Sequence, residues 1–108
     1  MQIEKDVFRA LADPTRRALF ERLTRGEASV NELTARFTIS QPAVSQHLAA
    51  LLKAGLVCQR RDASDRRLVH YSVAPHGLRP LVDWVALYQS FWRESMDRLS
   101  EVLQDMDP

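Results

Sequence analysis

The stretch S-Q-P-A-V-S-Q-H-L-A-A-L-L-K-A-G, residues 40–55, predicts one short helix with marked ends and two unlike faces. Ser40 has the side-chain oxygen of an N-cap, Pro42 is tolerated in a first turn, and Gly55 suits a left-handed residue after the last turn. At about 100° per residue, one stripe of this helix carries Val44, Leu48, Leu51 and Leu52. We therefore expect an amphipathic helix over about residues 41–54.

The opposite face of this helix is polar, and its side chains are small. It carries Pro42, Gln46, Ala49 and Lys53, with no bulky charge before the lysine. Gln and Ser side chains can read base edges in a DNA major groove, and small neighbours permit a close approach. An ordinary solvent-facing helix is the alternative, because such amphipathic helices are common. We expect Gln41, Ser45 and Gln46 to contact bases beside Pro42, whereas His47 on the flank is assigned equally to packing or to a DNA phosphate contact.

The composition predicts a single globular domain over residues 1–108, with 45% hydrophobic and 27% charged residues. No apolar run approaches the ~20 residues that a bilayer span needs, and the first residues lack a signal-peptide pattern. A single cysteine, Cys58, excludes an internal disulfide framework. We expect a cytoplasmic protein without membrane contact.

Charge is divided unevenly along the chain. Residues 1–79 hold 13 Lys and Arg against 8 Asp and Glu, whereas residues 80–108 hold 2 against 6. A basic front and an acidic tail suit a surface that binds a polyanion, although the charges could also serve only solubility.

Two helices are expected before the opening stretch. Ile3, Val7, Phe8 and Leu11 recur at helical spacing, so a first helix is predicted over about residues 3–12. Asp13 and Pro14 are start signals for a second helix that ends near Gly26. Arg16 and Arg17 lie in its first turns, where cations oppose the helix dipole, so we assign them to external phosphates, with a solvated face as the alternative.

A third short helix completes a helix-turn-helix arrangement. Ser29-Val30-Asn31-Glu32 is a capping-box pattern that opens a helix through Phe37. About three residues then join it to the helix that begins after Ser40. Two short helices at this spacing, the second with an open polar N-terminal half, are typical of DNA-binding proteins.

After Gly55 the apolar period changes to two, which predicts a hairpin over about residues 56–73. Its strands are expected at residues 56–61 and 67–73. A hairpin that directly follows a helix-turn-helix forms a wing, and arginines there can pair with phosphates. We assign this role to Arg60, Arg61, Arg66 and Arg67.

The chain then resumes as a long helix over about residues 78–105. Its apolar residues follow a rhythm of four and three, and four aromatic residues lie within nine positions. This surface exceeds what one small domain covers, so we expect a helix shared with another subunit; an aromatic ligand pocket is the weaker alternative. The expected contact residues, including those of the first helix, are Ile3, Val7, Phe8, Leu81, Trp84, Val85, Tyr88, Phe91, Trp92 and Leu99.

The order of these elements resembles the ArsR family of winged helix-turn-helix repressors. The residues that carry the resemblance are F-R-A-L-A-D-P-T-R-R-A-L-F-E-R-L from Phe8, S-Q-P-A-V-S-Q-H-L-A-A-L from Ser40, K-A-G-L-V from Lys53 and R-R…H-Y-S-V through Val73. The resemblance implies a homodimer joined through the first and last helices. It also implies two recognition helices in successive major grooves of double-stranded DNA, and repression by promoter occlusion.

The family's metal ligands are absent at the matching positions. Ser29 and Asn31 occupy the places where arsenic- and cadmium-sensing members carry cysteines, and Asp83 is followed by Trp84-Val85 rather than by the x-His of the zinc-type site. We therefore expect no metal and no cofactor.

The sequence thus predicts a mainly α protein with a small β-hairpin that acts as a DNA-binding repressor. We do not expect the protein to be an enzyme, because the sequence shows no nucleophile–base pair, Gly-rich phosphate loop or set of convergent carboxylates. Two alternatives stay open: a protein-interaction module, and a redox-responsive repressor that uses Cys58.

Overall fold

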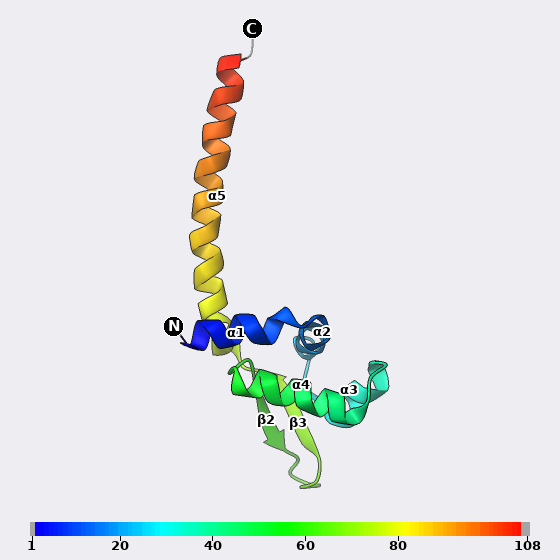
Figure 1. The fold of residues 1–108 in the computed structure, drawn as a ribbon. Coiled ribbons are helices and arrows are strands. Elements are labelled where there is room, and N and C mark those ends of the chain that lie inside the picture. Colours follow the sequence, from blue (N-terminus) through cyan, green and yellow to red (C-terminus); the bar gives the residue numbers. More distant parts are fainter. Residues whose placement is uncertain (1, 107–108) are drawn as a thin grey trace.

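The computed structural model describes the backbone of residues 2–106 and the side chains of residues 6–106. The elements in chain order are α1 (Gln2–Ala12), α2 (Pro14–Leu23), β1 (Ala28–Ser29), α3 (Val30–Arg36), α4 (Gln41–Lys53), β2 (Val57–Arg61), β3 (Val69–Val73), the 3-10 helix η1 (Pro75–Leu78) and α5 (Arg79–Met106). Helices α3 and α4 form the predicted helix-turn-helix, and the β2–β3 hairpin projects beside α4 as a wing (Figure 1). The predicted fold class is confirmed.

The three predicted helix starts are capped as the sequence indicated. The Asp13 carboxylate accepts from the Arg16 N–H at 3.0 Å, and the Ser40 hydroxyl accepts from the Ala43 N–H at 3.2 Å. At α3 the capping box is complete, because Ser29 and Glu32 each accept the other's backbone N–H. These side chains satisfy N–H groups that the first turn of a helix leaves unpaired.

Helix α4 ends at Lys53, and the predicted left-handed glycine follows its C-cap, Ala54. Gly55 has φ 77°, which is the left-handed region, and its N–H bonds to the Leu52 carbonyl at 3.0 Å. The next N–H, from Leu56, bonds to the Leu51 carbonyl at 3.0 Å. This pair of bonds is the Schellman motif, which stops the helix and turns the chain into β2.

The sheet contains one more strand than the sequence predicted. Its order is β1-β3-β2, with both pairings antiparallel and with Ala28 opposite Tyr71. A two-residue strand leaves no alternating pattern to detect, and Ser29 serves both as a strand residue and as the α3 cap. The second wing strand is also shorter than expected, because Arg67 and Leu68 belong to the connecting loop.

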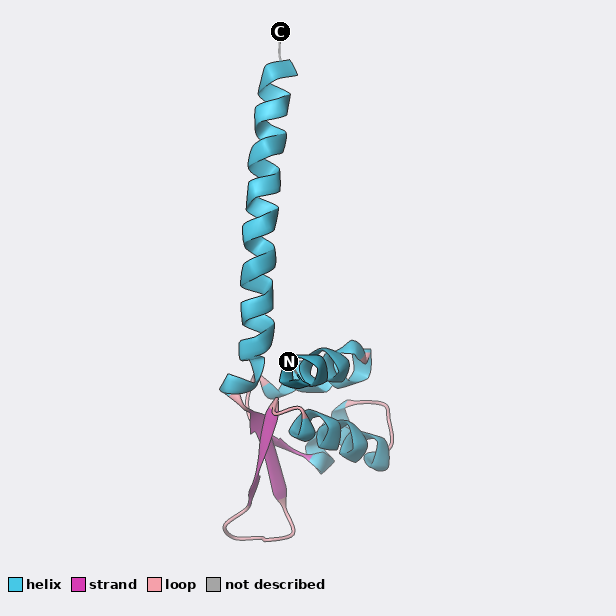
Figure 2. Cartoon of the chain, turned by 60° about the vertical axis from the view of Figure 1, so that its left-hand side comes forward, coloured by secondary structure: helices cyan, strands magenta, loops and turns pink. Residues whose placement is uncertain are grey.

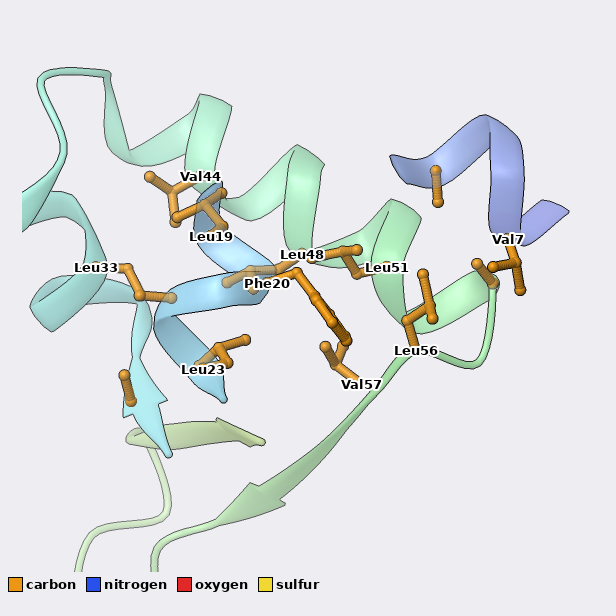
Figure 3. Close-up of a cluster of buried hydrophobic side chains, with 13 residues drawn as sticks. Val7, Leu19, Phe20, Leu23, Leu33, Val44, Leu48, Leu51, Leu56 and Val57 are labelled. Carbon is orange, nitrogen blue, oxygen red and sulfur yellow. The ribbon is translucent and has the colours of Figure 1, made fainter. Parts of the chain in front are cut away.

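The core forms where α4 packs against α2 and the start of the wing (Figure 3). Its fully buried side chains include Leu19, Leu33, Val44, Leu48, Leu51 and Leu56. Val7 of α1 is also fully buried in this core. The expectation that Val7 contacts a second subunit is therefore wrong, because the chain's own packing already covers the side chain.

Helix α5 stands apart from this core along most of its length (Figure 2). The molecule measures 71 × 29 × 21 Å with a radius of gyration of 19.5 Å, whereas a compact chain of this length has about 13 Å. The contacts of α5 with α1 and η1 lie in its first turns (Figure 1). Despite its length, no helix within residues 2–106 is apolar enough to cross a membrane.

The junction between α4 and α5 is a close approach of two backbone segments. An added Cβ at Gly77 in η1 would lie 2.1 Å from the Gly55 carbonyl oxygen and 2.9 Å from the Leu56 Cα. Backbone atoms cannot move aside as a flexible side chain can, so only glycine fits this position.

We predict that Gly77→Ala lowers the free energy of unfolding by about 1–3 kcal/mol or more, because the new methyl group forces the backbone apart. The measurement is urea unfolding followed by circular dichroism. Gly55→Ala is the matched comparison: its Cβ would meet nothing within 4 Å, so only the left-handed backbone costs energy, about 1 kcal/mol. A smaller loss for Gly77→Ala than for Gly55→Ala would contradict the close contact.

Candidate nucleic-acid interface

One side of the molecule presents both α4 and the wing, while α5 extends from the opposite side (Figure 1). Four α4 residues assigned to the DNA contact have exposed side chains: Gln41, Pro42, Ser45 and Gln46. Val44, Leu48 and Leu51 fix the helix by their burial, so the polar residues between them must face outward. The structure therefore leaves the predicted reading face open to a large partner.

Gln41 is held by the preceding helix. Its side-chain Nε2 donates to the Asn31 Oδ1 at 3.3 Å, and both residues are exposed. Asn31 lies in the first turn of α3, beside the capping box of Ser29 and Glu32. In the sequence, Asn31 is notable only as a position without a thiolate.

His47 is half-buried on the flank of α4, and the structure gives it a partner from α2. Arg16 Nε donates to the His47 Nδ1 at 3.4 Å, and an Arg16 terminal nitrogen approaches the Ala10 carbonyl at 3.4 Å. Arg17 donates to the Leu11 carbonyl at 2.9 Å. Both arginines thus bond to carbonyls in the last turn of α1, an internal role that helical periodicity does not predict. Their contact with DNA phosphates stays a prediction.

Arg60 of the wing is paired with an acidic residue before β1. Its guanidinium donates to the Glu27 carboxylate at 2.5 Å. This hydrogen bond lowers the pKa of Glu27, and the carboxylate raises the pKa of Arg60. The pair links β2 to the chain segment next to β1, although about half of each side chain is exposed to water, which screens its charge.

The loop at the end of the wing is organised by Asp62. One of its carboxylate oxygens accepts from the Ser64 hydroxyl at 2.6 Å and from the Ser64 and Asp65 N–H groups at 3.0 Å; the other accepts from His70 Nε2 at 3.1 Å. The bonds from Ser64, followed by the bond from His70, hold the pKa of Asp62 well below its ordinary value. Asp62 is therefore an anion at neutral pH and gives the loop a fixed shape.

The two loop arginines are presented on this scaffold. Arg67 is 94% exposed, with its Nε 3.5 Å from an Asp65 carboxylate oxygen. Within the described part of the chain, the Arg66 side chain makes no hydrogen bond or ion pair, while its carbonyl accepts from Arg61 at 2.8 Å. Of the four predicted wing arginines, Arg60 pairs with Glu27 outside the wing and Arg61 bonds to the wing loop. Arg66 and Arg67 lie in the loop itself.

An open hollow of about 220 Å³ lies between the start of α4 and the wing. Polar and apolar side chains from α3, α4 and the wing line it, among them Asn31, Gln41, Ser45, Arg67 and Tyr71. The structure thus brings two predicted base-contacting residues and one wing arginine to the border of one recess.

Exposed large hydrophobic side chains occur along the whole length of α5, beside exposed charged and polar residues. Its exposed large hydrophobic residues are Val82, Trp84, Val85, Leu87, Tyr88, Phe91, Trp92, Met96, Leu99, Val102, Leu103 and Met106. Trp84 stacks on Tyr88 at 5.6 Å and meets the edge of Phe8 from α1 at 5.6 Å. Leu81 is half-buried against the core, and Ile3 has a side chain outside the described residues.

The positions compared with metal ligands have other contacts. Ser29 caps α3 and is buried, Asn31 accepts from Gln41, and Asp83 pairs with Arg79 at 3.2 Å. Within residues 6–106 no three His, Cys, Asp or Glu side chains gather into a metal-binding group. Cys58 is exposed on β2, with its Sγ 3.3 Å from the Ser72 hydroxyl oxygen.

Comparisons with known proteins agree with this geometry. A family profile described as a helix-turn-helix domain matches residues 11–60, which hold α2, α3 and α4. The HTH-type transcriptional regulator Rv2034 of Mycobacterium tuberculosis is 50% identical over 74 residues, covering 68% of this chain. The match spans 66% of that relative, slightly under two thirds of its length.

Two solved structures share both sequence and fold with the chain. A possible transcriptional regulator for arsenical resistance is 46% identical, with a TM-score of 0.67 over 87% of this chain and 92% of that one. A protein described as an ArsR family transcriptional regulator is 30% identical, with a TM-score of 0.73 over 85% and 92%. The chain therefore belongs to the ArsR family of helix-turn-helix transcriptional regulators.

Proposed function

We propose that this protein is a homodimeric repressor that binds an inverted-repeat operator in double-stranded DNA and occludes a promoter. The observation that carries the proposal is the shared orientation of the exposed polar face of α4 and the arginine-bearing wing loop (Figure 1). A helix of this width fits a major groove, while the wing lies within reach of the flanking phosphates.

Base contacts are assigned to Gln41, Ser45 and Gln46, and backbone contacts to the wing. Glutamine offers a donor and an acceptor together, which is the pattern that adenine presents in the major groove. Pro42 is exposed at the same end of α4, and His47 can add a phosphate contact through the ring nitrogen that Arg16 leaves unbonded. Charge on Arg66 and Arg67 supplies attraction without sequence preference.

The dimer is proposed to form through α5, with Phe8 of α1 at its edge. At 1.5 Å per residue α5 is about 42 Å long, and helices that pack on nothing are marginal in water. Twelve large apolar side chains exposed along it form a surface that a monomer in water does not maintain. A second copy supplies the same stripe in return, as a two-fold interface requires.

Regulation is proposed to be independent of metal ions. Soft thiolates and imidazoles are the ligands that transition metals prefer, and positions 29 and 31 hold a hydroxyl and an amide instead. Both side chains already serve the fold, Ser29 as a cap and Asn31 as an acceptor for Gln41.

Gln46→Ala is predicted to reduce the preference for operator over random DNA, because a well-placed glutamine contributes about 1–3 kcal/mol of base discrimination. The measurement is the ratio of dissociation constants for selected and scrambled duplexes at one salt concentration. Substituting the exposed Arg93 of α5 by Ala is the control and leaves this ratio unchanged. Equal weakening of both duplexes by Gln46→Ala would contradict the assignment.

Arg66→Ala and Arg67→Ala are each predicted to reduce the slope of log affinity against log salt concentration by roughly one, since each removes one phosphate contact. Salt titrations of operator binding measure this slope. Arg60→Ala is the matched wing variant and should change the slope less, because Glu27 already pairs with that guanidinium. Unchanged slopes for both loop variants would argue against wing binding.

Leu99→Glu is predicted to convert the dimer into a monomer and to weaken operator binding at least tenfold. The residue lies on the apolar stripe of α5 and is 48% exposed, so a charge costs little in one chain but is unfavourable when buried between two. Sedimentation or light scattering measures the mass. Gln104→Glu places the same charge on the other face of α5 and should leave a dimer; a wild-type monomer would refute the interface.

A further inference from the structure

Gln41, the first residue of α4, has a side-chain amide with an acceptor on one side and a donor on the other. The Oε1 accepts hydrogen bonds and the Nε2 donates two. Adenine presents N7 as an acceptor and N6–H₂ as a donor in the major groove, whereas guanine presents two acceptors, N7 and O6. An amide that rotates freely can pair with adenine through both atoms or donate to guanine through Nε2, so an unrestrained glutamine discriminates poorly between the two purines.

The structure restrains this amide. Gln41 Nε2 donates to Asn31 Oδ1 at 3.3 Å, and Asn31 is the second residue of α3. The reciprocal bonds of Ser29 and Glu32 fix the backbone of that turn. Asn31 therefore offers its oxygen from a short side chain on a pinned backbone.

We infer that Asn31 is a positioning residue that makes Gln41 select adenine over guanine in the operator, because the Gln41–Asn31 hydrogen bond fixes the edge of the amide that faces the base. With one Nε2 hydrogen on Asn31, the amide keeps Oε1 and one hydrogen, which are the partners of adenine N6 and N7. Guanine would place its O6 against Oε1, and two acceptors repel. This role rests on the proposed operator binding and names one source of its specificity.

The surroundings of the pair leave room for a base edge. Asn31, Gln41 and Ser45 all border the open hollow of about 220 Å³ between α4 and the wing. Arg67 borders the same hollow from the wing loop. A DNA strand that brings a base edge to Gln41 can thus place a phosphate near a cation in the same approach.

The test is selection of bound duplexes from a random DNA pool by the full-length protein and four variants. Gln41→Ala identifies the base pair that Gln41 reads, because preference is lost there alone. Asn31→Ala should lower the adenine-to-guanine ratio at that pair by about tenfold, within the range expected for one bidentate contact. Asn31→Asp keeps an acceptor and should retain the adenine preference, although its charge weakens binding to all duplexes alike.

Ala35→Ser is the matched control on α3, an exposed position one turn further along, and should behave as wild type. Melting curves verify that each variant is folded. A folded Asn31→Ala protein with the wild-type ratio at the Gln41 position overturns the role of Asn31 and leaves operator binding intact. Guanine selected by the wild type at that position overturns it equally. A wild type that selects no sequence overturns the proposed function and this role together.

Discussion

Burial of the α4 stripe, Val44, Leu48 and Leu51, is the constraint on which the other features depend. Each such side chain contributes about 1.5–3 kcal/mol when it leaves water. A helix of 13 residues is marginal alone, so α4 exists because α2, α3 and the wing cover one side of it. Since the helical period fixes the angle between residues, burying one stripe also fixes where Gln41 and Gln46 point. Core packing thereby determines the direction in which the polar face of α4 points.

The wing holds four arginines in defined positions, and within the described residues not all of their charges are paired with a carboxylate. Glu27 and Asp62 are anions whose partners lower their pKa values, and they hold the base and the loop of the hairpin. Arg60 pairs with Glu27, and Arg61 donates to the Arg66 carbonyl, whereas the side chains of Arg66 and Arg67 extend from the loop. A loop with a defined form presents its exposed arginines with less conformational entropy to lose on binding.

Local signals made most of the fold predictable from the sequence. Asp13, Ser29, Ser40 and Gly55 set helix ends through bonds to neighbours within a few residues, so their identity alone predicts the boundary. Contacts between distant segments were not predictable in this way. Strand β1 has two residues and no pattern, and it is defined by pairing with Tyr71 and His70 far along the chain.

The candidate site divides along the same line. The exposed residues of α4 follow from helical periodicity, and the structure places them as the sequence indicated. The partners that hold site residues, such as Asn31 for Gln41 or Glu27 for Arg60, come from other elements and carry no mark of their role in the sequence. Val7 was misassigned for a related reason: a helical stripe shows that a residue is covered, without showing whether its own chain or a second chain covers it.

The contact of Gly77 with Gly55 fixes the position of α5 relative to α4. Two backbone segments contact each other there without side chains between them, so the two segments have little room to move relative to each other. Through this contact, η1 packs directly against the glycine that follows α4. Because η1 leads directly into α5, this contact sets the angle between α5 and α4. In a dimer built on α5, the angle at which the two copies of α5 cross would determine the distance between the polar faces of the two α4 helices. A change of a few degrees in that crossing angle would change the distance between the two α4 helices, and therefore the half-site spacing that the dimer fits.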